Sequence, residues 1–173
     1  MHPFRSLCLS LFVVSALVAL APPARADEQM IVKLAGDHPR YVVELEPQLL
    51  LTWNQVSDGP GVGLRATIPI VDNGFLSRIN NSVGIGFGFD ANPISSGKNF
   101  TLPVVLQWNF WLSTHFSVFG EPGLAVVFDH GDARFGPVIY AGGRYHFSPD
   151  IALTLRLLGV PSLDSAIGLS FLL

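Results

Sequence analysis

The chain has 173 residues, of which 49% are hydrophobic and only 13% are charged. Soluble domains usually carry about 25% charged residues, so this composition does not suit a water-covered surface. The length suits one domain. The formal net charge of -3 excludes the basic surface of a nucleic-acid-binding protein, and the single cysteine excludes a disulfide framework and any CxxC site.

The N-terminus has the three regions of a secretory signal peptide. Arg5 supplies the positive region, an apolar run ends at Leu20, and Ala24-Arg25-Ala26 is an A-x-A cleavage site. We predict that this segment is removed on export through the periplasm. Because Cys8 lies within it, the predicted mature chain contains no cysteine.

The rest of the chain has the period of strands. No stretch after Leu20 reaches the roughly 18 uninterrupted apolar residues that a membrane helix needs. From Tyr41 onward, polar and apolar residues alternate in eight segments separated by turn-rich breaks. Only helices and closed barrels satisfy the backbone in hydrocarbon, so we predict an all-β fold, an eight-stranded antiparallel up-and-down transmembrane barrel. The predicted strands are Tyr41–Trp53, Gly61–Ile70, Ser82–Asp90, Asn99–Leu112, Phe116–Asp129, Arg134–Ser148, Ile151–Leu158 and Ala166–Leu173. The predicted divisions are a signal peptide (1–26), a periplasmic N-terminal lead-in (27–40) and the barrel (41–173).

Each predicted strand has one apolar and one mixed face. In Asn99–Leu112, every second residue from Phe100 is apolar, whereas the other phase includes Gln107 and Asn109. A soluble barrel would turn the apolar face inward, but its surface should then be roughly 25–35% charged. Here the mixed faces carry few charges and many glycines, which suit the narrow lumen of an eight-stranded barrel. We therefore predict that the apolar face contacts lipid.

Aromatic residues of the apolar phase gather near both ends of the predicted strands. Rings of this kind are enriched where a membrane meets water, so we predict two girdles. Strand propensity alone explains aromatic residues in strands but not their collection at both ends. The outer girdle contains Trp53, Phe89, Phe100, Phe128 and Phe135, and the periplasmic girdle contains Tyr41, Phe110, Phe116, Tyr145, Phe147 and Phe171.

Six ionisable residues fall in mid-strand on the inward phase, and their charges cancel. An unpaired buried charge is unfavourable, so we expect ion pairs. Similar heights on adjacent strands suggest the pairs Glu46–Arg65 and Glu121–Arg144. We predict a network that plugs the lumen, and the alternative is a charge-lined pore or gate. The predicted network comprises Glu44, Glu46, Arg65, Glu121, Arg144 and Arg156.

Two features depart from a regular barrel. Prolines fall inside predicted strands, and because they lack an N–H and a closed barrel has no free edge, we expect bulges or bends, for example at Glu121-Pro122-Gly123. The connection Val71–Asn81 is long for a periplasmic turn, and its residues Phe75, Leu76 and Ile79 would give one helical turn an apolar face. The prolines are Pro47, Pro69, Pro103, Pro122 and Pro137.

The last strand, Ala166–Leu173, has a glycine, alternating apolar residues and a near-terminal aromatic residue. By this strand and the repeated pattern, the chain from Tyr41 onward resembles the small eight-stranded outer membrane proteins of the OmpA transmembrane-domain and OmpX type. The resemblance implies a bacterial outer membrane location, an ion-paired interior, and contact with outer membrane lipids and lipopolysaccharide. It also implies that the barrel-assembly machinery reads the last strand. The matching residues are Gly168, Leu169, Phe171 and Leu173, the last standing where the family has a terminal aromatic residue.

Three motifs suggest chemistry, but each has a simpler interpretation. His146-Phe147-Ser148 is similar to the His-x-Ser pair of the lipid A 3-O-deacylases, yet the predicted topology places it at a periplasmic turn, and those enzymes act at the outer leaflet. Asp129-His130-Gly131-Asp132 offers ligands for a divalent cation, but we interpret it as a tight hairpin. Gly84-x-Gly86-x-Gly88 lies within a strand and indicates interior packing, not a phosphate loop.

We therefore predict no enzyme, no cofactor and no metal site. The favoured role is structural or surface-exposed. The alternatives are a narrow pore for ions or small solutes and, third, a lipid A-modifying enzyme.

Overall fold

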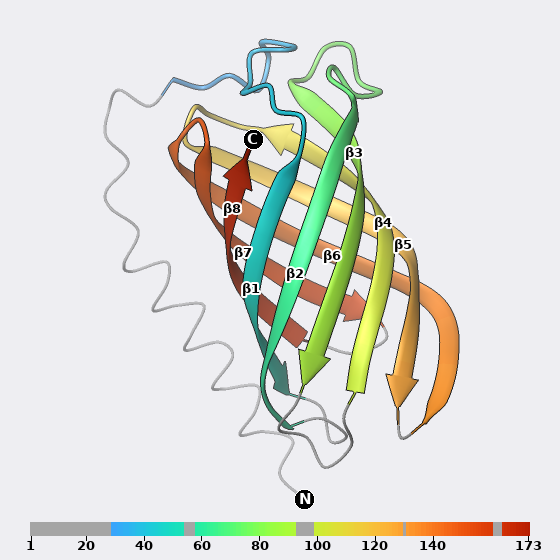
Figure 1. Cartoon of the computed structure of the whole chain (residues 1–173). Helices are drawn as coiled ribbons and strands as arrows, with labels where there is room; N and C mark the ends of the chain where they lie inside the picture. Colours follow the sequence, from blue (N-terminus) through green and yellow to red (C-terminus); the bar gives the residue numbers. More distant parts are fainter. Residues whose placement is uncertain (1–28, 54–57, 93–98, 130, 161–163) are drawn as a thin grey trace, which may run out of the picture.

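The computed structural model describes residues 29–53, 58–92, 99–129, 131–160 and 164–173. Within these ranges every regular element is a β-strand, and the strands pair in chain order to form one closed antiparallel barrel (Figure 1). The predicted fold class is confirmed. Among the described residues, no helix is long and apolar enough to cross a membrane. The strands are β1 (Glu44–Trp53), β2 (Asp58–Val71), β3 (Asn81–Asn92), β4 (Asn99–Trp111), β5 (Phe116–Asp129), β6 (Asp132–Ser148), β7 (Ile151–Val160) and β8 (Asp164–Leu172).

The first and last strands meet directly. Leu45 lies opposite Phe171 in the register of β1 and β8. Beyond the end of β8, the carbonyl oxygen of Leu173 accepts the backbone N–H groups of Val42 at 2.6 Å and Val43 at 3.2 Å, and the Leu173 N–H donates back to Val43 at 2.9 Å. A sheet closed in this way has no free edge, which is what hydrocarbon requires of strands.

The two faces of the wall are inverted relative to a water-soluble protein. Outward residues such as Ile68, Val104 and Leu124 are 47–50% exposed although they are apolar. Inward residues such as Thr67 and Gln107 are 1–3% exposed although they are polar. The predicted facing of the strands therefore agrees with the structure.

The prolines interrupt ladders without ending strands. Register pairs are missing beside Pro47 in the β1–β8 seam, beside Pro103 in β3–β4 and beside Pro122 in β4–β5, and the β2–β3 register shifts between Pro69 and Val71. Each of these prolines removes a donor from one seam only. The expected bulge next to Pro122 is not present: the β4–β5 register is the same on both sides of the missing pairs, and the β5–β6 register is continuous through Pro122.

Most predicted girdle residues lie on the outer surface of the wall. Tyr41 does not: it lies before the start of β1, where the chain turns inward, and packs against buried Ile31, Trp111 and Leu172. Its predicted lipid contact is wrong, because Tyr41 matches the alternation of β1 but precedes the first residue of that strand. The side chain of Trp53 lies outside the described part of the chain. The other outward rings are Phe89, Phe100, Phe128 and Phe135 towards the end with the β5–β6 hairpin, and Phe110, Phe116, Tyr145, Phe147 and Phe171 towards the opposite end.

Candidate functional site: the polar lumen and its covered mouth

All six predicted interior charges point into the lumen. Strand alternation puts them on the inward face, and their exposed fractions are 1–3%. Each is held by polar partners from other strands, as buried ions require. These residues are Glu44 and Glu46 on β1, Arg65 on β2, Glu121 on β5, Arg144 on β6 and Arg156 on β7.

Arg156 is the centre of the network, because its guanidinium contacts carboxylates from two strands. Its Nε donates to Oε2 of Glu121 at 3.0 Å, and its Nη1 donates to Oε1 of Glu46 and, at 2.6 Å, to Oε1 of Gln48. Gln107 Nε2 donates to the other oxygen of Glu121 at 2.8 Å. These contacts fix one cation between two carboxylates in the middle of the lumen.

A second layer lies nearer the end that is predicted to be periplasmic. Arg144 Nη2 is 2.7 Å from Oε1 of Glu44, and Nη1 donates to Oδ1 of Asn109 at 2.6 Å. Two guanidinium groups lie over the ring of Phe119. The Cζ of Arg144 is 4.3 Å from the ring centroid, and the Cζ of Arg156 is 5.1 Å from it. A π-face attracts cations, so this ring stabilises both guanidinium groups.

A third layer lies towards the opposite end, which is predicted to be the outer one. Arg65 Nη2 is 2.6 Å from Oδ2 of Asp90, and Gln48 Nε2 donates to Oδ1 of the same carboxylate at 2.8 Å. The Cζ atom of Arg65 lies over the ring of Tyr140, 5.2 Å from the ring centroid. Gly88 leaves room for this side chain, since a Cβ there would lie 1.9 Å from Nη1 of Arg65. The sequence prediction missed Asp90, although it shares the inward phase of its strand.

The pairs themselves differ from those predicted. Glu46 and Arg65 are opposite each other in the register, but Arg65 reaches along the barrel to Asp90. Arg144 pairs with Glu44 rather than with Glu121. Both predicted pairs are wrong: Arg65 extends two residues along the adjacent strand β3 to Asp90, and Arg144 crosses the narrow lumen from β6 to Glu44 on β1.

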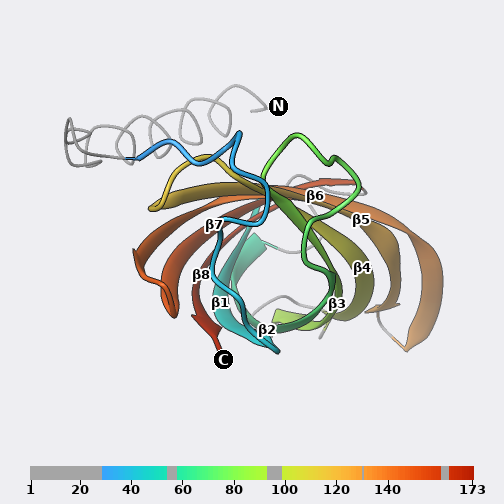
Figure 2. The same cartoon turned by 90° about the horizontal axis from the view of Figure 1, so that it is seen from above.

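The segment predicted as a lead-in covers the mouth of the barrel at the end where Leu173 lies (Figure 2). The N–H of Ile31 donates to the carbonyl of Leu112 at 3.1 Å, and the backbone N–H of Asn80 donates to the carbonyl of Val32 at 2.8 Å. The ring of His38 stacks on Trp111 with centroids 5.3 Å apart. Figure 2 shows the segment crossing the opening of the barrel. Burial at this mouth raises the pKa of the Tyr41 phenol, as does the nearby carboxylate of Glu44.

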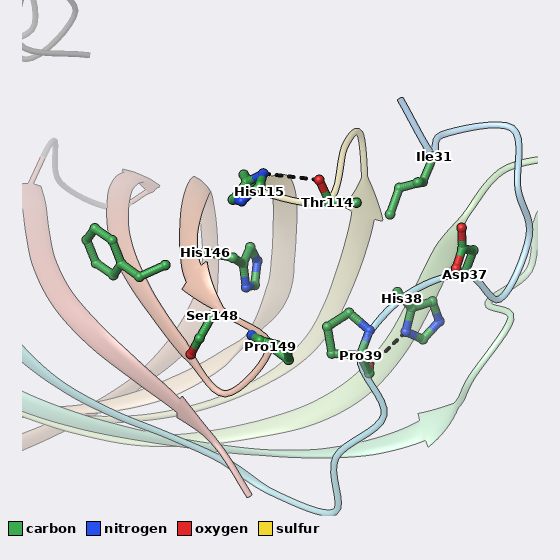
Figure 3. A pocket seen from close by; sticks show the side chains of 10 residues that line it. Ile31, Asp37, His38, Pro39, Thr114, His115, His146, Ser148 and Pro149 are labelled. Carbon is green, nitrogen blue, oxygen red and sulfur yellow. Dashed lines mark hydrogen bonds between the residues drawn. The ribbon is translucent and has the colours of Figure 1, made fainter. Parts of the chain in front are cut away.

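A pocket of about 450 Å³ opens beside this segment (Figure 3). His146 lines it and faces inward, where its Nε2 is 3.0 Å from Oγ of Ser117. Ser148 instead accepts the backbone N–H groups of Asp150 at 3.3 Å and Ile151 at 3.2 Å, so it shapes the turn. The His-x-Ser motif is therefore not assembled as a pair, and no carboxylate in the described ranges is hydrogen-bonded to the imidazole of His146.

The other two motifs form parts of the wall. Asp129 lies opposite Asp132 at a hairpin whose Gly131 has φ +94, and His130 lies outside the described residues. Within the described ranges, no three His, Cys, Asp or Glu side chains are grouped to hold a metal. The strand glycines include Gly86, where a Cβ would lie 2.8 Å from Val105, which fits the interpretation as interior packing.

The predicted assembly signal follows the alternation of β8. Gly168 is buried on the inward side, where a Cβ would lie 2.9 Å from Cγ of Glu46. Leu169 and Leu173 are 43% and 63% exposed, and Phe171 is partly exposed. Recognition of this strand by the assembly machinery stays a prediction.

No protein-family model matches the chain, and no curated protein matches it in sequence. Solved structures do match. A chain from the de novo design of transmembrane β-barrels superposes with a TM-score of 0.56 at 15% identity, covering 76% of this chain and 94% of the designed one. This protein has the fold of a transmembrane β-barrel.

Two natural barrels also match. The N-terminal β-barrel domain of Pseudomonas aeruginosa OprF has a TM-score of 0.49 at 12% identity, covering 75% of this chain and 95% of that domain. The Yersinia pestis outer membrane protein Ail in a phospholipid nanodisc has a TM-score of 0.48 at 9% identity, covering 76% of this chain and 99% of Ail.

Proposed function

We propose that this chain is an integral protein of a bacterial outer membrane, with a lumen closed by an ion-paired plug and a structural or surface-exposed role. The inverted wall carries this proposal: apolar side chains cover the outside, while arginines and carboxylates 1–3% exposed fill the inside. Water-soluble domains place such groups the other way round. The signal peptide predicted at the N-terminus supports export.

The contacts across the lumen favour a plug over a pore. Gln48 joins the outer layer to the centre, since its amide donates to Asp90 and its oxygen accepts from Arg156. Asn109 joins the centre to the periplasmic layer, since it donates to Gln107 at 3.1 Å and accepts from Arg144. An ion passing through would have to break several charge-assisted hydrogen bonds in a low-dielectric space.

Planar-bilayer recording of the folded mature chain tests the plug. We expect no steady conductance steps from the wild type, because no layer of the network opens without losing buried ion pairs. The exposed-charge variant Arg134→Gln should be equally silent. Steady wild-type steps whose ion selectivity changes in Glu46→Gln, but not in Arg134→Gln, would establish the pore instead.

Cell fractionation with heat-shifted gel mobility tests the location. We expect the mature chain in the outer membrane fraction, migrating as a compact form until it is heated. Lipid A mass spectra with and without the protein should be identical, and a modified lipid A would support the enzymatic alternative.

A further inference from the structure

The connection between β2 and β3, residues 72–80, presents apolar side chains to its surroundings. Phe75 is 63% exposed and Leu76 is 40% exposed. Both would contact water if this connection simply projected into the periplasm, which would be unfavourable for groups of this size. A water-exposed loop therefore does not explain why these two side chains point outward.

The exposed ring continues the lipid-facing surface of the wall. Phe75 contacts Trp108 edge to face, with centroids 5.7 Å apart and an interplanar angle of 79°. Trp108 is on the outward face of β4, and its ring is 5.1 Å from that of Phe110 on the same face. The aromatic row of β4 thus extends beyond the strand end into the connection.

Asn81 is one of the buried side chains that hold the connection in this position. Asn81 is 0% exposed, and its Nδ2 donates to the carbonyls of Leu76 at 2.8 Å and Ile79 at 2.6 Å. Its Oδ1 accepts from Trp108 Nε1 at 2.9 Å. Gly74 has φ +50, and a Cβ there would clash with Asn81 at 1.7 Å. These contacts fix carbonyl groups of the turn against Asn81, while the side chains of Phe75 and Leu76 stay exposed.

We propose that residues 72–80 are an interfacial anchor that inserts Phe75 and Leu76 into the periplasmic leaflet of the bilayer. The occupant is phospholipid, because the exposed patch is continuous with a wall surface that already faces lipid. Exposed Arg78 is in the same connection, suited to the phosphate level of the headgroups. Aromatic and long basic side chains are characteristic of this depth of a membrane. This inference rests on the proposed membrane location of the barrel.

Single-cysteine labelling tests the anchor, since the predicted mature chain has no cysteine of its own. An environment-sensitive fluorophore is attached at Phe75→Cys, and in a second variant at Leu76→Cys. Asp150→Cys is the matched control, because it is exposed on the β6–β7 turn at the same end of the barrel. Val104→Cys marks the wall. Each is folded into nanodiscs of phosphatidylcholine and phosphatidylglycerol that contain spin-labelled lipid.

We expect spin-labelled lipid to quench the labels at positions 75, 76 and 104 severalfold more strongly than the label at 150, and aqueous iodide to show the opposite order. If positions 75 and 76 behave like 150 while 104 is quenched by lipid, the anchor is refuted and the membrane barrel stands. If lipid quenches none of the four labels, the proposed membrane location itself fails.

Discussion

The lumen and the outer surface belong to the same wall, yet they specify structure in different ways. On the inside, each charged group has particular partners at particular distances, as Arg156 has with Glu46 and Glu121. On the outside, residues such as Val104 are half exposed and need only be apolar. The inside therefore depends on the identity of each residue, whereas the outside depends on a property that many residues share.

This difference predicts contrasting tolerance to mutation. An inward change breaks a directed contact and leaves its partner buried and unsatisfied. Replacing one outward apolar side chain by another should matter little, whereas an outward polar or charged substitution should destabilise the barrel more the closer it lies to the bilayer midplane.

The largest effect is expected from Arg156→Met. The substitution keeps much of the side-chain length but leaves two buried carboxylates without their shared cation, which should lower the free energy of unfolding by about 3–5 kcal/mol. Urea titration in lipid, followed by heat-shifted gel mobility, measures this change. Arg134→Met at an exposed site is the matched control and should change stability by less than about 0.5 kcal/mol. Similar values for the two variants would remove the distinction between lumen and surface.

The next effect concerns the outer face. Val104→Arg near the middle of β4 should cost about 2–4 kcal/mol, because it places a charge near the bilayer midplane. Phe135→Arg, close to the outer end of β6, should cost about 0–1 kcal/mol in the same titration. Equal losses at both depths would mean that lipid does not surround the wall.

The smallest effect compares two glycines of one strand. A Cβ at Gly123 would lie 2.3 Å from the carbonyl oxygen of Val104, so Gly123→Ala should destabilise by about 1–3 kcal/mol. At Gly120 a Cβ meets nothing within 4 Å, and Gly120→Ala should stabilise by about 0.5–1 kcal/mol through reduced chain entropy. Unfolding midpoints of the two variants shifted in the same direction would contradict this account.

The wall could be predicted from the sequence because strand alternation is local and repeats along the chain. The bounds of β5 agree with the prediction exactly as Phe116–Asp129, and the inward placement of Arg156 required only its phase within β7. The composition then made it possible to predict which face meets lipid, since the chain has too few charged residues to cover a soluble surface.

The partners inside the lumen could not be predicted from local pattern. Whether Arg65 contacts Glu46 or Asp90 depends on stagger and side-chain direction, which are properties of the closed barrel. The cover formed by Ile31 and His38 has no periodic signal. The role of Asn81 was equally hidden, because it depends on carbonyl groups that converge only when the turn is folded.

The pairing of Leu173 with Val42 and Val43 sets an order of events. All eight strands lie between these partners in the sequence, so translation reaches Leu173 only after the rest of the barrel. Until β8 is available to pair, β1 must keep an unpaired edge that invites association with other chains. Truncation by a few C-terminal residues should therefore act as a biogenesis defect, yielding an open sheet prone to aggregation or proteolysis.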